Sequence, residues 1–453
     1  MYDTYRAGPA EQLSGVDLLK RQGQRNLHRH FASTSHIAAL PLMLRLAQVN
    51  ATSAQAAWKT YINTLEEALS AQLTRIAEQT ALNAVLGAYE GDLLFEERLI
   101  DLFDPLIPQR AQSAAQQAKL QDKLTQARAA LKVFFNELDP TVRDLRPAPY
   151  YAILLADGDR MGRVINNQDM LQHQTLSRAL DEFADKARDI VEQTHFGALV
   201  YAGGDDVLAF VPLHTVLACA TELATVFATA LAGYPERAGP EGQPGKSPTL
   251  SVGIVVAHHL EPLSDTLALA RAAEKAAKAM PGKNALAITI SKRSGSDTTV
   301  AGPQATLGHR LRRFVALHRH DKLPDGAAYE LRDLALRLWV PPAPVAQVNK
   351  VDSPAVTAQR VAHTTLLELM ATEAARIVGR KRGQGGSQEP NKQLVQNLDT
   401  YLRQIAAEIA ARPQMTHSPL AQLADELIVA REFARAATLA GLPKESLDAD
   451  LDH

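Results

Sequence analysis

The sequence predicts an α+β protein in which a small antiparallel sheet with ferredoxin-like βαββαβ order is flanked by helical segments. Short apolar runs of strand length lie between residues 150 and 290, and longer segments with helical periodicity lie on both sides of them. A Gly-Gly-Asp-Asp turn separates two of the strand-like runs, as expected of a tight hairpin. We therefore expect an N-terminal helical domain over residues 1–147, a sheet domain over 148–295 and a C-terminal helical domain over 296–453.

The first helical segment runs from Ala54 to about Leu138 and is rich in Ala, Leu, Gln, Glu, Lys and Arg. Its apolar residues follow helical spacing, as in Trp58, Tyr61, Ile62, Leu65 and Leu69. Prolines at positions 140, 147 and 149 then disfavour helix, which predicts a domain boundary there.

The sheet domain alternates between strand-like and helix-like runs. The expected strands cover residues 150–156, 197–202, 207–211, 250–257 and 285–290, and the expected helices cover 176–192, 213–231 and 263–280. Beyond about Ser291 the sequence returns to helical texture up to His453, interrupted by a basic, glycine-rich stretch over residues 379–387.

Composition excludes several classes of protein. The 453 residues include 48 Lys and Arg against 50 Asp and Glu, so a net charge of -2 gives no general argument for binding nucleic acid or anionic membranes. No apolar run approaches the roughly 18 residues of a membrane helix. A single cysteine, Cys219, cannot form an internal disulfide. We expect a cytoplasmic protein.

Three aspartates are placed where they could share a site. Asp157 ends the first expected strand, and Asp205 and Asp206 lie at the tip of the hairpin that should pair beside it. Clustered carboxylates raise one another's pKa unless a cation lies between them, and such oxygen ligands suit Mg²⁺ or Mn²⁺. Two ions there would support nucleotidyl transfer. A hairpin turn without chemical function is the structural alternative.

Two lysines and one further aspartate accompany this cluster. Lys278, near the end of the last expected helix, and Lys283, in the following turn, could neutralise phosphates, or could simply be solvated residues at a helix end. Asp159 either caps the segment that follows it or acts as a further metal ligand. Four arginines at positions 310, 312, 313 and 319 share an expected helix, as a solvated surface or as contacts to RNA phosphates.

Four motifs in order resemble one family. The strings YYAILLADGDRMGRVI, LVYAGGDDVLAFVPL, TLSVGIVVAHHLEPL and PGKNALAI resemble the catalytic palm domain of the large subunit of type III CRISPR effector complexes, in particular the III-B (Cmr) branch. The resemblance implies a fold similar to nucleotide cyclases and GGDEF-like diguanylate cyclases. It also implies conversion of ATP into cyclic oligoadenylate when the complex captures target RNA.

The same resemblance assigns roles to residues. It implies that Asp157, Asp205 and Asp206 are catalytic and hold two Mg²⁺ or Mn²⁺ ions. It places nucleotide binding at Gly158, Gly203, Gly204, Lys278 and Lys283. The implied partners are the other subunits of a type III effector complex, together with guide RNA and target RNA.

The sequence also departs from this family. Large subunits of this kind usually begin with an HD nuclease domain and a first palm domain, for which the residues before Gly15 give no room. The segment GVDLLKRQGQRNLHRHFASTSHIAALP resembles the region that follows the family's zinc-binding element, whose cysteines are missing. We therefore expect a separate first-palm partner or self-association.

Three hypotheses remain open from the sequence. The first is a palm-type nucleotidyltransferase that makes cyclic oligoadenylate within an antiviral ribonucleoprotein. The second is a non-catalytic scaffold subunit of the same complex, and the third is a diguanylate cyclase-like enzyme, which would use GTP instead of ATP.

Overall fold

The structure is a computed structural model that describes residues 32–49, 52–69, 73, 86–103, 114–237, 245–293, 295–339, 354–380, 392–412 and 417–444. The chain divides into two compact units, one formed by residues 1–36 and 46–144 and the other by residues 37–45 and 145–453. The three domains expected from the sequence remain a prediction. None of the described helices is long and apolar enough to cross a membrane.

The first unit is helical. Its elements are α3 (Thr34–Gln48), which contributes to both units, then α4 (Thr52–Leu69), the 3-10 turn η1 (Gly91–Leu94), α6 (Glu96–Phe103) and α8 (Ala114–Asn136). The apolar stripe expected on α4 is confirmed, because Trp58, Tyr61 and Leu65 are all buried. The polar atoms of two of these rings are also satisfied, since Trp58 donates to the carbonyl of Leu86 and Tyr61 to that of Leu93. The stripe therefore fixes α4 against the segment around η1.

The second unit contains one six-stranded sheet in the order β2-β3-β1-β4-β5-β6. The strands are β1 (Tyr150–Gly158), β2 (Ala198–Gly203), β3 (Asp206–Val211), β4 (Leu250–His258), β5 (Ala285–Ile290) and β6 (Thr298–Pro303). Neighbours pair antiparallel except β4 and β5, which are parallel. The predicted α+β class is confirmed, and β1 lies beside the β2–β3 hairpin as the expected topology requires.

The sixth strand corrects the expectation of helical texture beyond Ser291. Strand β6 pairs antiparallel with β5 and forms an edge of the sheet. Its side chains alternate, with Thr298 and Val300 buried and Thr299 exposed. Six residues that include a glycine and end in proline give a weak strand pattern, and edge strands are where proline is tolerated. Pairing with β5 supplies the stability that the local sequence does not indicate.

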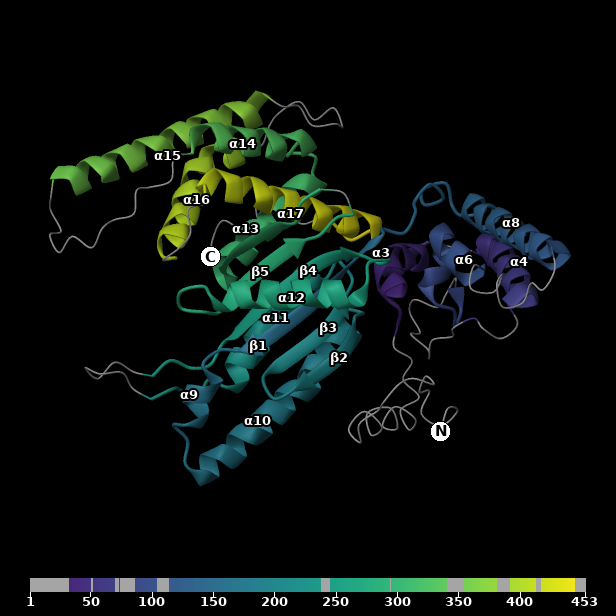
Figure 1. Ribbon diagram of the computed structural model, residues 1–453, viewed down its shortest axis with the longest axis horizontal. Coiled ribbons are helices and arrows are strands. Elements are labelled where there is room, and N and C mark those ends of the chain that lie inside the picture. Colours follow the sequence, from purple (N-terminus) through teal and green to yellow (C-terminus); the bar gives the residue numbers. More distant parts are fainter. Residues whose placement is uncertain are drawn as a thin grey trace. The chain divides into compact units, whose positions relative to one another are not determined.

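Helices cover both faces of the sheet (Figure 1). On one face, α10 (Met170–Asp189) and α11 (Val216–Ala230) bury Phe183 and Phe227, whose rings meet edge to face, against alternate residues of β1 such as Leu154. On the other face, α12 (Leu263–Lys278) packs on β1, β4 and β5. Helix α10 begins earlier than expected because Asp169 forms a capping box with Gln172.

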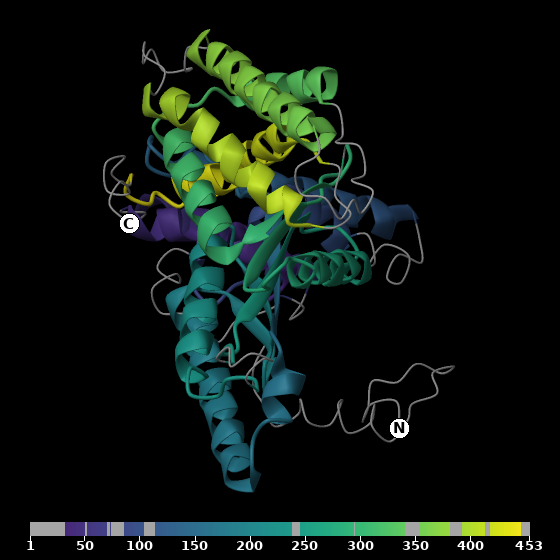
Figure 2. The same cartoon turned by 90° about the vertical axis from the view of Figure 1, so that its left-hand side faces the viewer.

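The C-terminal helices gather at the end of this unit opposite to the start of α10 (Figure 2). They are α13 (Gln304–Arg319), α14 (Asp325–Leu338), α15 (Pro354–Arg380), α16 (Lys392–Ala410) and α17 (Pro419–Leu439). Of the basic, glycine-rich stretch expected over residues 379–387, the part after Arg380 lies outside the described residues.

The arginines of α13 are mostly buried, which argues against an RNA-binding surface there. Arg310 is 1% exposed and its guanidinium forms ion pairs of 2.8 Å with Glu408 on α16 and with Glu426 on α17. Arg319 donates to the carbonyls of Leu442 and Pro443. Only Arg312 is exposed among the four, so the interpretation as RNA contacts is wrong for Arg310, Arg313 and Arg319.

Candidate active site

The sheet brings the three aspartates to one edge. Asp157 is the next-to-last residue of β1, where Ala156 pairs with Val207 of β3. Gly158 donates its N–H to the carbonyl of Asp205 at 3.1 Å, and Gly203 pairs with Asp206 across the hairpin. We name the set Asp157, Asp205 and Asp206 the acidic edge.

Glycines allow the close approaches that build the acidic edge. A methyl group added at Gly158 would lie 2.6 Å from Cβ and 2.9 Å from Oδ2 of Asp205, closer than packed atoms tolerate. Gly204 has φ +66°, the left-handed conformation that the tight turn needs. Gly203 faces a side chain instead, because a methyl group there would lie 2.3 Å from the hydroxyl of Tyr201. Gly158 thus sets the position of Asp205.

The charges at this edge interact. Burial raises the pKa of Asp205, and the nearby charges of Asp157 and Asp206 raise it further, while Lys278 lowers it. Burial and the charge of Asp157 also raise the pKa of Asp206, again opposed by Lys278. Positive charge brought to this edge therefore favours the ionised carboxylates.

Lys278 already supplies one such charge. Its ammonium contacts the carboxylate of Asp157 and lies 3.5 Å from that of Glu274, one turn earlier on α12. Helix α12 reaches this position because it crosses Gly253 of β4, where a methyl group would lie 2.3 Å from the backbone nitrogen of Glu274. Neither Glu274 nor Gly253 is among the site residues expected from the sequence. An isolated glycine inside a strand was the available signal for such a close approach.

The side chains of the acidic edge are of the kind that binds divalent cations. Carboxylate oxygens are the ligands that Mg²⁺ and Mn²⁺ prefer, and a bound cation would oppose the burial and neighbouring charges that raise the pKa of Asp205 and Asp206. Across the part of the chain that the structure describes, however, no three His, Cys, Asp or Glu side chains are grouped closely enough to hold a metal ion. The carboxylates are suitable ligands for these ions, but a metal ion that binds Asp157 would have to displace the ammonium of Lys278.

Asp159 has a structural role that matches neither of its two expected alternatives, since α9 (Met161–Ile165) has no side-chain cap and the carboxylate is engaged elsewhere. It is fully buried, and its carboxylate accepts hydrogen bonds from the hydroxyls of Thr249 and Ser251 and from the N–H of Asn284, at 2.8 to 2.9 Å. Asn284 follows Lys283 in the turn between α12 and β5. Lys283 itself has φ +59° and is partly exposed.

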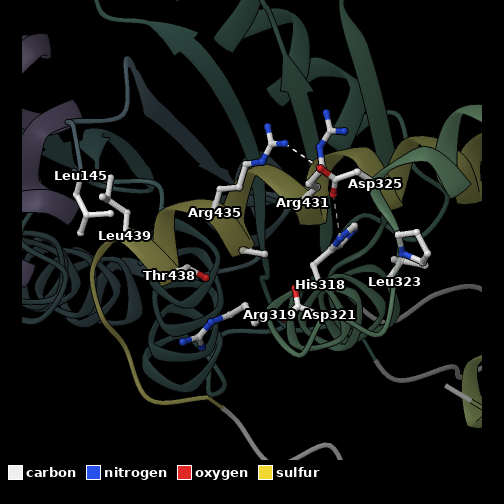
Figure 3. A pocket seen from close by; sticks show the side chains of 12 residues that line it. Leu145, His318, Arg319, Asp321, Leu323, Asp325, Arg431, Arg435, Thr438 and Leu439 are labelled. Atoms are coloured by element: carbon white, nitrogen blue, oxygen red, sulfur yellow. Dashed lines mark hydrogen bonds and ion pairs between the residues drawn. The ribbon is translucent and has the colours of Figure 1, made fainter. Parts of the chain in front are cut away.

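A separate cavity lies among the C-terminal helices (Figure 3). None of the residues that line it belongs to the acidic edge. Its volume is about 420 Å³. Arg435 donates to Asp325 at 3.0 Å, and the ring of neutral His318 lies 3.9 Å from the same carboxylate. The other two arginines of this cavity have partners outside its lining, since Arg319 donates to the carbonyls of Leu442 and Pro443 and Arg431 pairs with Glu432.

Comparison with known proteins identifies the sheet region. Residues 150–287 match the family model for the second palm domain of Cas10/Cmr2. The chain is similar to the CRISPR system Cmr subunit Cmr2 of Pyrococcus furiosus, at 32% identity over 207 residues, which cover 39% of this chain and 23% of that relative.

Solved structures give weaker likenesses. A type III-B Cmr-beta complex in the apo state matches with a TM-score of 0.46 and 10% identity, covering 93% of this chain and 49% of the other. A Csm1–Csm4 cassette in complex with cA4 matches with a TM-score of 0.36 and 13% identity, covering 62% of this chain and 36% of the other.

The sheet with its aspartate-bearing hairpin therefore matches a palm domain. Over residues 150–287 the chain matches the second palm domain of Cas10/Cmr2, and it is similar in sequence to Cmr2 over the aligned residues. The chain covers about a quarter of the length of that curated relative.

Proposed function

We propose that this chain is the nucleotidyltransferase subunit of a type III CRISPR effector complex and converts ATP into cyclic oligoadenylate. The observation that carries the proposal is the acidic edge within a Cas10/Cmr2 second palm domain, where Gly158 holds Asp205 beside the end of β1. In this proposal the chain assembles with other effector subunits, guide RNA and target RNA, and the name of its relative, a subunit of the CRISPR Cmr system, supports such an assembly. A separate first-palm partner or a second copy of the chain would face this edge.

The reaction joins a ribose hydroxyl oxygen of one ATP to the α-phosphorus of another, and the bond from that phosphorus to pyrophosphate breaks. Two Mg²⁺ or Mn²⁺ ions would supply charge neutralisation and activation of the hydroxyl when bound. In this proposal Asp157, Asp205 and Asp206 hold these ions. Lys278, released from Asp157, and Lys283 bind the phosphates as point charges.

The test uses the assembled effector complex with ATP, Mg²⁺ and target RNA, and detects cyclic products by mass spectrometry. Asp205→Ala combined with Asp206→Ala should abolish synthesis, whereas Asp185→Ala, which removes an exposed carboxylate on α10, should leave it unchanged. Full synthesis by the double variant would refute the assignment. GTP as the sole nucleotide separates a diguanylate cyclase-like enzyme from the proposed one, because only the former would turn it over.

The contact between Lys278 and Asp157, together with the lack of a three-ligand cluster among the described residues, favours one alternative. In that alternative the chain is a scaffold subunit without catalysis. It predicts that the complex assembles normally with the double aspartate variant and that the wild-type complex turns over no nucleotide.

A further inference from the structure

The turn between α12 and β5 has an unusual backbone. Three successive residues have positive φ, with +85° at Gly282, +59° at Lys283 and +49° at Asn284. The left-handed conformation costs a residue with a side chain about 1–2 kcal/mol, although asparagine tolerates it better than most. Lys283 and Asn284 therefore keep this conformation only because contacts elsewhere in the fold hold the turn in place.

One of these contacts comes from Asp159. Its Oδ2 accepts the N–H of Asn284 at 2.9 Å, across 125 residues of sequence. The same carboxylate accepts from the hydroxyls of Thr249, just before β4, and of Ser251, the second residue of β4. The backbone N–H of Asp159 also donates to the carbonyl of Thr249 at 2.7 Å. Hydrogen bonds to an ionised carboxylate are roughly twice as strong as neutral ones. Asp159 therefore joins the end of β1, the start of β4 and the turn.

The next residue holds the other side of the turn. The guanidinium of Arg160 donates to the carbonyl of Gly282, and its Nε lies 3.9 Å from the carboxylate of Glu236. Arg160 has φ +66° itself, so its backbone is also in a restricted conformation. Asp159 and Arg160, which we name the turn clamp, thus bind an N–H and a C=O that are two residues apart.

The position of the turn clamp connects it to the acidic edge. Asp159 follows Asp157 by two residues, and Ser251, which donates to Asp159, pairs with Asp157 across β1 and β4. On the other side, Lys278 ends α12 and contacts Asp157, and the turn begins only a few residues later. In the proposed function Lys278 and Lys283 bind the phosphates. Both therefore lie on a segment whose C-terminal end, the turn, is fixed to the end of β1 by the turn clamp.

We propose that Asp159 and Arg160 are positioning residues that hold the Pro281–Asn284 turn so that Lys283 stays fixed relative to Asp157 for binding of a nucleoside triphosphate. This inference rests on the proposed function. It assigns neither residue to the chemistry, because Asp159 is fully buried with both oxygens engaged and Arg160 acts on a carbonyl of the turn. The ligand group concerned is the polyphosphate, a multiply charged anion.

The first measurement does not depend on catalysis. Hydrogen exchange is followed in the complete effector complex, in the peptide that contains Asn284 and Ala285. In Asp159→Asn an amide, with one C=O and one N–H₂, replaces a carboxylate that accepted three donors. Hydrogen exchange in the Asn284–Ala285 peptide should therefore accelerate about tenfold or more. Arg160→Gln, which removes the contact to Gly282 and leaves the buried network intact, should accelerate exchange in the same peptide. Thr249→Val, which removes a single hydroxyl, is the matched control and should change it less.

The second measurement is the KM for ATP against kcat for cyclic product. Both Asp159→Asn and Arg160→Gln should raise KM about tenfold and change kcat much less, because they displace a phosphate contact and leave the acidic edge in place. Asn284→Gly keeps both the N–H and the tolerance of positive φ, so it should behave as wild type, whereas Asn284→Val should resemble Asp159→Asn.

The outcomes separate the two proposals. A wild-type complex without synthesis overturns the proposed function, while exchange still reports on the turn clamp. Wild-type exchange in both Asp159→Asn and Arg160→Gln overturns the clamp itself. Faster exchange with an unchanged KM shows that the clamp is structural and overturns its role in positioning Lys283. Faster exchange with a raised KM and a nearly constant kcat supports the proposal.

Discussion

The ammonium of Lys278 contacts the carboxylate of Asp157 and so joins the last turn of α12 to the end of β1. Burial lowers the pKa of Lys278, but the hydrogen bond and charge of Asp157, with the charge of Glu274, outweigh that effect and raise it. Lys278 is therefore charged at neutral pH. Any divalent cation that binds Asp157 has to compete with this ammonium.

Lys278→Met should change metal and nucleotide binding in opposite directions. Removing the competing ammonium should increase the affinity of the acidic edge for Mn²⁺, by about tenfold if the lost contact is worth about 1.4 kcal/mol. The affinity for ATP should fall, because a phosphate partner is lost. Titration calorimetry with Mn²⁺ alone and then with ATP measures both.

Lys275→Met is the matched control for this change. Lys275 is exposed on the same helix, one turn from the contact, and should affect neither affinity. A decrease of Mn²⁺ affinity in Lys278→Met would contradict the competition argument, and an unchanged ATP affinity would contradict the phosphate role of Lys278.

Gly158→Ala should reduce synthesis of the cyclic product without unfolding the protein. The added methyl group would overlap Cβ and Oδ2 of Asp205, so this carboxylate has to move. A displacement of about 1 Å in a catalytic group can cost about a hundredfold in rate. The rate of ATP turnover and the thermal unfolding curve are measured together.

Gly162→Ala controls for the general effect of an added methyl group. Gly162 lies in the short helix α9 (Met161–Ile165), and a methyl group there would meet nothing within 4 Å. Activity should remain at the wild-type level. Equal losses in the two alanine variants would show that Asp205 is not the sensitive contact.

The acidic edge could be predicted from the sequence because short-range rules determine it. Glycine at position 204 specifies the turn, and the order of strands brings the hairpin beside β1. The partners of Lys278 could not be predicted in the same way. Its contact with Asp157 depends on how closely α12 crosses the sheet, and that distance is set by the missing side chain of Gly253. The metal ligands, the cofactors and the cyclic product remain predictions.

The burial of the arginines of α13 also depends on packing between distant segments, so it could not be predicted from the sequence. A cluster of positive charges on an amphipathic helix is usually solvated, and nothing near Arg310 in the sequence indicates otherwise. Its acidic partners, Glu408 and Glu426, lie 98 and 116 residues further along the chain. Only the packing of α13 against α16 and α17 brings them together.

Arg310→Leu should therefore destabilise the second unit strongly. The substitution leaves Glu426, which is fully buried, without its cation. Breaking a buried ion pair from one side costs about 3–5 kcal/mol. Urea unfolding followed by circular dichroism measures the change in the free energy of unfolding.

Arg403→Leu serves as the comparison. Arg403 bonds Asp399 at 2.7 Å on the exposed side of α16, where water screens the two charges, so loss of this pair should cost little stability. The two variants should differ several-fold in their effect. Similar small losses would mean that water reaches Glu426 when Arg310 is removed.

Protonation of three buried histidines should contribute to the loss of stability in acid. Burial lowers the pKa of His36, His214 and His318 to about 4, compared with an ordinary value of 6.5. Above the ordinary value these neutral rings carry no penalty. As the pH falls below 6.5, the unfolded chain takes up protons that the folded chain accepts only near pH 4, so the free energy of unfolding decreases across that range.

His318 provides the specific test, because its ring bonds the carbonyl of Leu427 inside the C-terminal helices. The lowered pKa corresponds to at most about 3.5 kcal/mol, at about 1.4 kcal/mol for each pH unit. His318→Gln should therefore lose less stability than wild type between about pH 6.5 and pH 4.5. His173→Gln, at an exposed position on α10, should follow the wild-type curve. Parallel curves for all three proteins would show that protonation of His318 does not contribute to acid unfolding.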